Sequence, residues 1–207
     1  MSKRTFDSAK RMVDFVVSAA LLFLFFPIML LVAFLVWMSL GRPIFFHQLR
    51  VGLDERPFQI IKFRTMREAV EAKSPHDNDR TTRIGRFLRA TSLDELPQLV
   101  NVFRGEMSLV GPRPLLLEYL PLYSVQHRRR HSVRPGLTGL AQVSGRNLLN
   151  WKHRLDLDIH YVDSRCLALD LRILASTTRL LLSWSAAQSN KEVSMPRLQR
   201  DYLEGLD

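Results

Sequence analysis

The hydrophobic residues of this chain gather in one uncharged stretch near its start and alternate with polar residues in the segment that follows. The uncharged stretch runs from Phe15 to Leu40, and about 20 apolar residues are enough to cross a bilayer. A cleaved signal peptide would carry an apolar core of only about 7 to 15 residues. We therefore expect residues 1–40 to form a membrane segment.

Pro27 lies near the middle of this stretch, in LLFLFFPIMLL. An interior proline lacks the N–H that a helix needs, so it costs about 3 kcal/mol or more and bends the helix. Each piece on either side is too short for a hydrocarbon core of about 30 Å. This favours a re-entrant helix that enters the membrane and turns back, while a straight span with a tolerated proline remains the alternative.

Basic residues lie on both sides of the apolar stretch. They are Lys3, Arg4, Lys10 and Arg11 before it and Arg42, Arg50 and Arg56 after it. A spanning helix is expected to carry its Lys and Arg mainly toward one end, on the cytoplasmic side. The flanking charges therefore also favour a helix that keeps both of its ends in the cytoplasm.

The segment after Gly41 changes to alternating apolar and polar residues. PIFFHQLRVG and PFQIIKFRTM surround the turn sequence LDER, which predicts a β-hairpin. Lys62 and Arg64 are two residues apart on the second strand, so we expect both on one face. That face could bind phosphate, or it could be an ordinary solvated strand face.

Near the C-terminus, residues 168–184 are apolar with Arg172 and Arg179 set among them. This pattern suits a helix that lies in a membrane interface, and it suits a buried core helix equally well. We expect a globular domain over residues 41–187 and a polar tail over residues 188–207. The fold class is α+β, mostly helical.

The net charge and the cysteine content of the chain limit the kinds of ligand and the location to be expected. The chain has 207 residues and a formal charge of +10, which favours ligands that carry phosphate, such as nucleotides, anionic lipids or nucleic acid. Its single cysteine, Cys166, cannot form an internal disulfide, so the cytoplasmic side of the membrane is the default location.

The densest group of candidate functional residues lies in DRTTRIGRFLRATSLDELPQ. Arginines recur there at every third position, at Arg80, Arg83, Arg86 and Arg89, which predicts a basic ridge on a helix or a solvated face. Asp94 and Glu95 follow. Ser92 with Glu95 also fits a capping box at a helix start, whereas the nearby cations favour a phosphate site in which the two carboxylates have different roles.

Two further segments combine arginine with constrained backbone. Arg113 lies between two prolines in GPRP, and Arg146 follows glycines in VRPGLTGLAQVSGRN; a guanidinium fork suits phosphate. His127 and His131 are four residues apart in QHRRRH, but the three arginines between them disfavour a metal site and favour a structural role.

Taken together, these segments resemble the bacterial sugar transferase family, the monotopic polyprenyl-phosphate phosphoglycosyl transferases. The resemblance is carried by KRMVD, the proline-broken membrane helix, VGLDERPFQIIKFRTM, TSLDELPQLVNVFRGEMSLVGPRP, the segment ending in GRN, and LDLDIHYVDSRCLALDLRIL. The chain resembles the small members that hold only the catalytic unit. It departs from their usual pattern at Phe26, where many have serine, and at Leu140, where many have tryptophan.

The resemblance implies a specific reaction. A sugar-1-phosphate would pass from a UDP-sugar, with an N-acetylated amino sugar expected, to polyprenyl (undecaprenyl) phosphate, releasing UMP at the cytoplasmic face of the bacterial inner membrane. It implies Asp94 as nucleophile and Mg²⁺ ligand, with Glu95 as its partner. The implied substrate contacts are Arg113 and Arg146, with Lys62, Arg64 and Arg89 as weaker candidates.

Two other classes of protein are compatible with the basic charge. One is a membrane-tethered protein that binds RNA or anionic lipid without catalysis, and the other is a metal-dependent membrane phosphatase. Acidic side chains weaken phosphate binding unless a metal or a reaction requires them. Asp94 and Glu95 within the basic cluster therefore favour the transferase, which needs membrane lipids but no nucleic acid.

Overall fold

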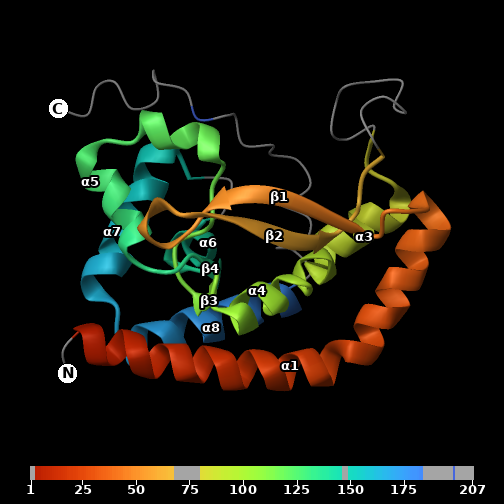
Figure 1. Ribbon diagram of the computed structural model, residues 1–207, viewed down its shortest axis with the longest axis horizontal. Coiled ribbons are helices and arrows are strands. Elements are labelled where there is room, and N and C mark those ends of the chain that lie inside the picture. Colours follow the sequence, from red (N-terminus) through yellow and green to blue (C-terminus); the bar gives the residue numbers. More distant parts are fainter. Residues whose placement is uncertain (1–2, 68–79, 146–148, 184–197, 199–207) are drawn as a thin grey trace.

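The computed structural model describes residues 3–67, 80–145, 149–183 and 198. It is mostly helical, with two small sheets. The long N-terminal helix runs along one side of the molecule, and the hairpin lies along another (Figure 1). The expected mostly helical α+β fold is confirmed at this level.

Helix α1 (Lys3–Leu40) is continuous through Pro27, so the apolar stretch is not divided into two separate helices. Its axis nevertheless changes direction along its length (Figure 1), as expected of a helix with an interior proline. Within the described part of the chain, α1 is the one helix long and apolar enough to cross a membrane. Its path in a membrane stays a prediction.

Both arms of α1 contact the rest of the protein. The N-terminal arm is fastened to the body by Arg11, which donates to the carbonyls of Val102 (2.8 Å) and Phe103 (2.7 Å). The Phe15 ring stacks on the Phe103 ring at 4.7 Å between centroids. On the C-terminal arm, Val32 and Val36 pack in a second apolar cluster with Phe63 and Leu88.

The expected hairpin is confirmed. Strands β1 (Phe45–Val51) and β2 (Pro57–Phe63) pair antiparallel, with Phe45 opposite Phe63 and Val51 opposite Pro57. A short 3-10 turn, η1 (Leu53–Glu55), connects them. Because β2 ends at Phe63, the alternation of faces applies to Lys62 but no longer to Arg64.

The chain then forms α3 (Arg83–Thr91), the 3-10 turn η2 (Leu93–Glu95) and α4 (Gln98–Arg104). The second sheet pairs β3 (Ser108–Val110) in parallel with β4 (Gly136–Thr138). Between them lie η3 (Leu117–Leu122), α5 (Val125–Arg128) and η4 (Arg129–Ser132). The chain continues with α6 (Leu140–Ser144), α7 (Trp151–Ser164) and α8 (Leu167–Leu182).

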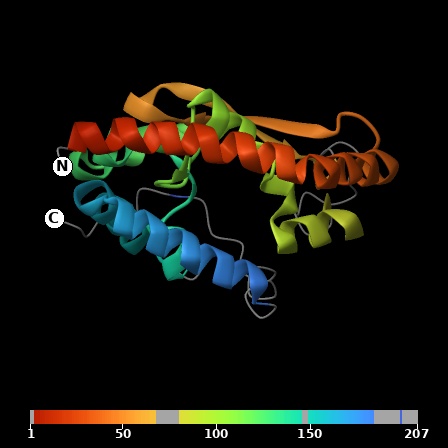
Figure 2. The ribbon, with the colours of Figure 1, turned by 90° about the horizontal axis from the view of Figure 1, so that it is seen from below.

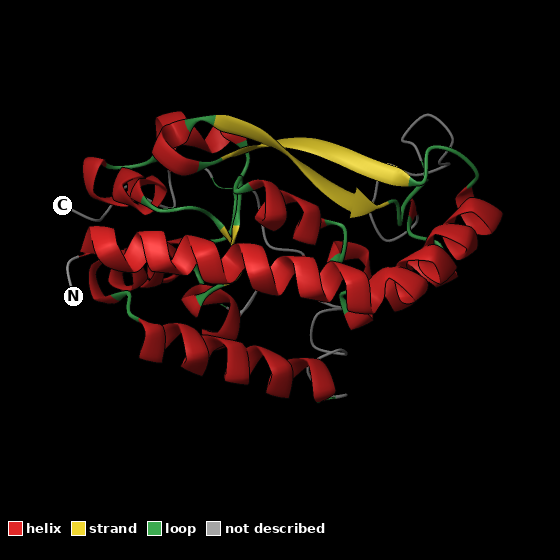
Figure 3. Ribbon diagram, turned by 60° about the horizontal axis from the view of Figure 1, so that its bottom comes forward, coloured by secondary structure: helices red, strands yellow, loops and turns green. Residues whose placement is uncertain are grey.

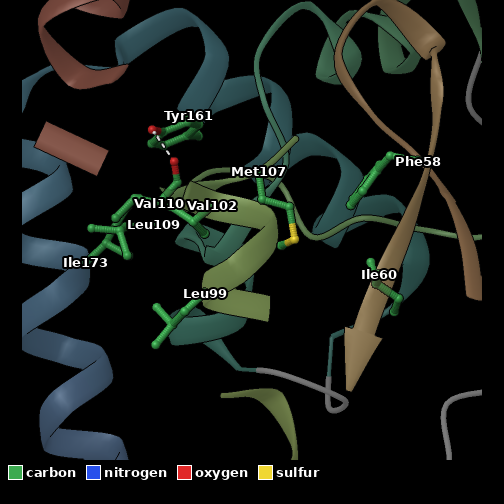
Figure 4. Close-up of a cluster of buried hydrophobic side chains, with 9 residues drawn as sticks. All are labelled: Phe58, Ile60, Leu99, Val102, Met107, Leu109, Val110, Tyr161 and Ile173. Atoms are coloured by element: carbon green, nitrogen blue, oxygen red, sulfur yellow. Dashed lines mark hydrogen bonds between the residues drawn. The ribbon is translucent and has the colours of Figure 1, made fainter. Parts of the chain in front are cut away.

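The main hydrophobic core joins these elements around β3. It consists of Phe58, Ile60, Leu99, Val102, Met107, Leu109, Val110, Tyr161 and Ile173 (Figure 4). The Tyr161 hydroxyl donates to the carbonyl of Val110 at 3.1 Å. This core fixes β2 and α4 relative to each other, and so determines where the short turn η2 is held.

Helix α8 has two different faces. Ile173 is in the core, while Leu171, Arg172 and Arg179 are exposed. Figures 2 and 3 show α8 running beside α1, and the ion pair between Lys10 and Asp170 (2.5 Å) ties the start of α8 to α1. The helix therefore has one side in the core and one exposed side with apolar residues. The first fits the core-helix interpretation of residues 168–184, and the second is compatible with the interfacial one.

Candidate active site

Asp94 and Glu95 lie on η2, between the end of α3 and the start of α4. Helix α3 ends at Thr91, and the backbone of its C-cap residue, Ser92, is left-handed with a φ of 59°. The Ser92 side chain forms no capping hydrogen bond; its carbonyl instead accepts the N–H of Glu95 at 3.1 Å. The capping-box interpretation is therefore wrong, and both carboxylates are available for another purpose.

The Glu95 carboxylate binds two cationic side chains that are far apart in the sequence. Its Oε1 accepts hydrogen bonds from Lys62 Nζ at 2.6 Å and from Arg113 Nη2 at 3.1 Å. Burial alone would raise the pKa of Glu95, but the charges and hydrogen bonds of Lys62 and Arg113 outweigh burial and hold that pKa well below its usual range. Glu95 is therefore ionised and fixed in place at neutral pH.

Asp94 is in a different electrostatic environment, although it is adjacent in sequence. Burial, with a smaller contribution from the negative charge of Glu95, raises the pKa of Asp94 to about 6. Lys62, Arg89 and Arg113 act in the opposite direction. The pKa values of the two carboxylates are thus shifted in opposite directions, a pattern that is common at functional sites.

Asn101 holds the strand of Lys62 against the helix that follows Glu95. Its Oδ1 accepts the N–H of Ile61 at 3.1 Å, and its Nδ2 donates to the carbonyl of Gln59 at 2.8 Å. Asn101 is fully buried on α4. It therefore connects β2 directly to α4 next to the Lys62–Glu95 contact, through the residues that precede Lys62 on the strand.

Arg113 reaches the site from a loop whose main chain is held at several points. Gly111 N donates to Thr138 O and Gly136 N donates to Pro112 O, each at 2.9 Å. The carbonyl of Arg113 itself accepts a hydrogen bond from Arg130 at 2.7 Å. The Arg113 side chain is 42% exposed, and the charge of Glu95 is the main cause of its raised pKa. It can therefore bind Glu95 and still face an incoming ligand.

The structure thus brings together Asp94, Glu95, Lys62 and Arg113, and it places Arg89 near enough to influence Asp94. It directs the Arg64 guanidinium elsewhere, to the carbonyls of Met66 (3.2 Å) and Arg42 (3.1 Å). Arg146 lies outside the described residues.

The predicted basic ridge is shorter than expected, because Arg80 precedes α3 and donates to the carbonyl of Arg67. The His127 ring lies 3.2 Å from Asp156. Among the residues that the structure describes, no group of three or more His, Cys, Asp or Glu side chains converges.

Arg50 is a site residue that sequence reasoning missed, because it counted only as one of the cations flanking the membrane segment. Its guanidinium lies 3.5 Å from the carbonyl of Pro114 and donates to Gln48 at 2.5 Å. Burial, together with the neighbouring charge of Arg113, lowers the pKa of Arg50 to about 10. Alternation along β1 could have placed it on the same face as Gln48, but not beside Arg113.

The oxygen ligands present fit Mg²⁺ bound mainly through a substrate. Asp94 and Glu95 supply carboxylates, and Glu95 Oε1 is already shared by two cations. Mg²⁺ is commonly held by one or two carboxylates plus substrate phosphates rather than by a cage of protein ligands. Asp94 is the residue best suited to hold it here, because its buried carboxylate lies beside the negative charge of Glu95, which a cation would offset.

Comparisons with known proteins identify relatives of this chain. The chain is 44% identical over 190 residues to EpsL of Bacillus subtilis (strain 168), an uncharacterized sugar transferase, covering 91% of this chain and 94% of that protein. It is 43% identical over 189 residues to the UDP-glucose:undecaprenyl-phosphate glucose-1-phosphate transferase of Caulobacter vibrioides, covering 86% and 71% of the two chains.

The exopolysaccharide production protein ExoY of Sinorhizobium fredii is 40% identical over 188 residues, which cover 82% of this chain and 83% of that protein. The family model for bacterial sugar transferases matches residues 5–184. That match includes helix α1 from Thr5 onward, the hairpin and every residue of the site described above. The chain belongs to the bacterial sugar transferase family.

Proposed function

We propose that this protein transfers a sugar-1-phosphate from a UDP-sugar to polyprenyl phosphate and releases UMP. The observation that carries the proposal is the environment of Asp94, a buried carboxylate whose neighbour Glu95 is fixed by Lys62 and Arg113. The name of the Caulobacter relative, an undecaprenyl-phosphate glucose-1-phosphate transferase, supports the same reaction class.

The proposed chemistry has two displacement steps. An oxygen of the Asp94 carboxylate attacks the β-phosphorus of the UDP-sugar, and the bond from that phosphorus to the bridging oxygen breaks, so UMP leaves with the electron pair. An oxygen of the lipid phosphate then attacks the same phosphorus and displaces Asp94. Covalent catalysis of this kind replaces one difficult transfer by two easier ones.

The cations around Asp94 provide what this reaction needs from the protein. Both steps bring anions together, and fixed positive groups stabilise the charge that spreads over the transferred phosphoryl group. Arg113 and Arg89 would contact phosphate oxygens, Lys62 would hold Glu95, and Arg146 would add a further contact. Mg²⁺ held by Asp94 would neutralise diphosphate charge when bound.

The membrane arrangement is part of the proposal. We place the globular part and the N-terminus together on the cytoplasmic face of the bacterial inner membrane, with α1 re-entrant. Pro27 lies inside α1, and the helix is bent (Figure 1). The exposed apolar side chains of α1 and the leucines of α8 suit contact with lipid.

Mass spectrometry tests the covalent step. Detergent-solubilised protein is incubated with UDP-sugar and Mg²⁺ in the absence of lipid acceptor, and the reaction is then quenched. The peptide containing Asp94 should carry a sugar-phosphate adduct. Asp94→Asn keeps the volume but removes the nucleophile, so turnover should fall by roughly a thousandfold or more. Undiminished UMP release by Asp94→Asn, or release only when both substrates are bound, would favour direct transfer in a ternary complex.

Measuring the products released from UDP-sugar, polyprenyl phosphate and Mg²⁺ separates the transferase, which releases UMP, from the other two classes of protein. A phosphatase would release inorganic phosphate, and a lipid-binding or RNA-binding protein would release nothing. Removal of divalent metal by EDTA should abolish UMP release and added Mg²⁺ should restore it; full activity with excess chelator would refute the metal requirement.

The sugar is tested with a panel of donors. An N-acetylated amino sugar is our prediction for this chain, whereas relatives carry names that specify UDP-glucose or UDP-galactose. UDP-glucose, UDP-galactose and UDP-N-acetylated amino sugars should be compared at equal concentration by their rates of UMP release. A clear preference for a plain hexose would contradict the amino-sugar prediction.

A further inference from the structure

A completely buried ion pair lies directly behind the loop of Arg113. The side chains of Arg130 on η4 and Asp158 on α7 are 1% and 2% exposed. Arg130 donates from Nε (3.0 Å) and from Nη2 (2.7 Å) to the same oxygen, Asp158 Oδ2. Burying two charges is costly, and replacing such a pair by apolar residues is often neutral or stabilising. Stability alone is therefore a weak reason for this pair to be present.

The contacts of Arg130 indicate another reason. Besides Asp158, its Nη2 donates to the backbone carbonyl of Arg113 at 2.7 Å. Its guanidinium also lies over the ring of Tyr123, 5.8 Å from the centroid. One planar group thus connects α7 to the main chain of the residue whose own side chain bonds Glu95 at 3.1 Å.

We propose that Arg130, oriented by Asp158, is a positioning residue for the transfer reaction that holds the main chain at Arg113, so that the Arg113 guanidinium is directed toward Glu95 and the donor phosphates. This inference rests on the proposed role of Arg113 as a phosphate contact. The Arg130 guanidinium itself touches neither Asp94 nor Glu95 in any described contact. Its effect on the reaction is therefore transmitted through Arg113.

The geometry requires the fork of an arginine. Arg130 Nη2 donates to both Asp158 Oδ2 and Arg113 O, and Nε adds a second bond to Asp158. A lysine keeps the charge but has a single ammonium on a flexible stem, so it lacks the planar, fixed set of donors. A misplacement of about 1 Å at a reacting site can cost roughly 100-fold in rate.

The first test is Arg130→Lys in the full chain in detergent, with UMP release measured against UDP-sugar concentration. We expect the KM for the donor to rise about tenfold or more, because a loosened Arg113 binds phosphate less well. The matched control is Arg165→Lys. Arg165 also donates from Nε and Nη2 to a carboxylate, that of Asp7 (2.9 and 2.8 Å), and its remaining described hydrogen bond goes to the carbonyl of Val162 rather than to the Arg113 loop. Its KM should change less than twofold.

Combining Arg130→Lys with Arg113→Lys distinguishes positioning from a general structural effect. If Arg130 acts through Arg113, the second substitution should add less than about threefold to the loss in kcat/KM caused by Arg113→Lys alone. A multiplicative effect of the two, or an unchanged KM in Arg130→Lys, would overturn the inference while leaving the proposed function intact. Unchanged kcat/KM in Arg113→Lys would instead refute the phosphate-binding role of Arg113, and the inference with it.

A second variant addresses folding. Replacing the pair together, Arg130→Met with Asp158→Leu, removes both charges at similar volume and should preserve or increase the thermal unfolding temperature. We expect this protein to fold yet to show the raised donor KM of Arg130→Lys. A folded double variant with the donor KM of the parent would overturn the inference.

Discussion

Replacing Asn101 by alanine should loosen the contact between β2 and α4, and so separate Lys62 from Glu95. The substitution removes three hydrogen bonds of a fully buried side chain, to Ile61 N (3.1 Å), Gln59 O (2.8 Å) and Glu106 Oε2 (2.7 Å). Each typical hydrogen bond contributes about 1 kcal/mol net. The expected loss in the free energy of unfolding is therefore about 3 kcal/mol.

In a chain of this size each kcal/mol lowers the unfolding temperature by about 2–4 °C, so Asn101→Ala should unfold roughly 6–12 °C below the parent. Thermal unfolding in detergent, followed by circular dichroism, measures this. The kcat/KM for the donor should also fall at temperatures where the variant is folded, because Lys62 and Glu95 are placed by this link.

The control is Ser124→Ala, which removes one capping hydrogen bond, from His127 N at 3.2 Å, at the start of α5. It should cost about 1 kcal/mol and leave kcat/KM unchanged. A decrease of less than about 2 °C for Asn101→Ala, or full activity in that variant once folded, would refute the reasoning.

Three further predictions concern pH, close packing and the membrane helix. Burial, with the charge of Arg130 as the next cause, lowers the pKa of His131 from 6.5 to about 3. Below pH 6.5 the unfolded chain therefore binds a proton that the folded protein does not. The free energy of unfolding should fall with decreasing pH by up to about 1.4 kcal/mol per pH unit. Urea unfolding from pH 7 to 5 should show this slope, with a smaller one in His131→Gln; equal slopes in the two proteins would contradict it. Gly85→Ala would place a Cβ only 2.0 Å from the backbone oxygen of Thr65, so α3 must shift and the unfolding temperature should fall, and an unchanged temperature would show that α3 has room to adjust. Pro27→Ala should let α1 straighten. A cysteine introduced at position 2 in a Cys166→Ser background should then react with an impermeant reagent added outside intact cells, and it should not react when Pro27 is present. Labelling with Pro27 present would refute the re-entrant helix.

The local elements could be predicted from the sequence because their signals are local. The alternation of apolar and polar residues over residues 43–66 predicted the hairpin, and the long apolar run predicted α1. The error at Arg64 has a simple cause: the strand ends one residue earlier, at Phe63. Beyond a strand end, the two-residue period no longer determines where a side chain points.

The convergence of Lys62, Glu95 and Arg113 could not be derived from the pattern, because it depends on non-local packing. Asn101 ties β2 to α4, and the parallel pairing of β3 with β4 holds the Arg113 loop across an intervening segment. Neither contact leaves a periodic signal. The resemblance to a family identified the same residues, but not the hydrogen bonds that join them.

Arg130 shows a similar limit. The run QHRRRH has the composition of a solvated basic surface, yet Arg130 is 2% exposed while its neighbours Arg128 and Arg129 are exposed. Within η4, Arg130 and the adjacent His131 are both buried, whereas Arg129 is exposed. Which arginine of three equal neighbours takes the buried place depends on α7 and Asp158, which lie more than twenty residues further along the chain.

The brace formed by Arg11 has a consequence for how this protein meets its lipid substrate. Arg11 binds the last carbonyls of α4, and Phe15 stacks on Phe103, so α1 and α4 move as one body. If α1 sits in the bilayer as proposed, the depth to which α1 inserts sets the height of Asp94 relative to the lipid phosphates. A thicker or thinner bilayer would then raise or lower the whole reaction centre relative to the lipid phosphates, and turnover would follow acyl-chain length.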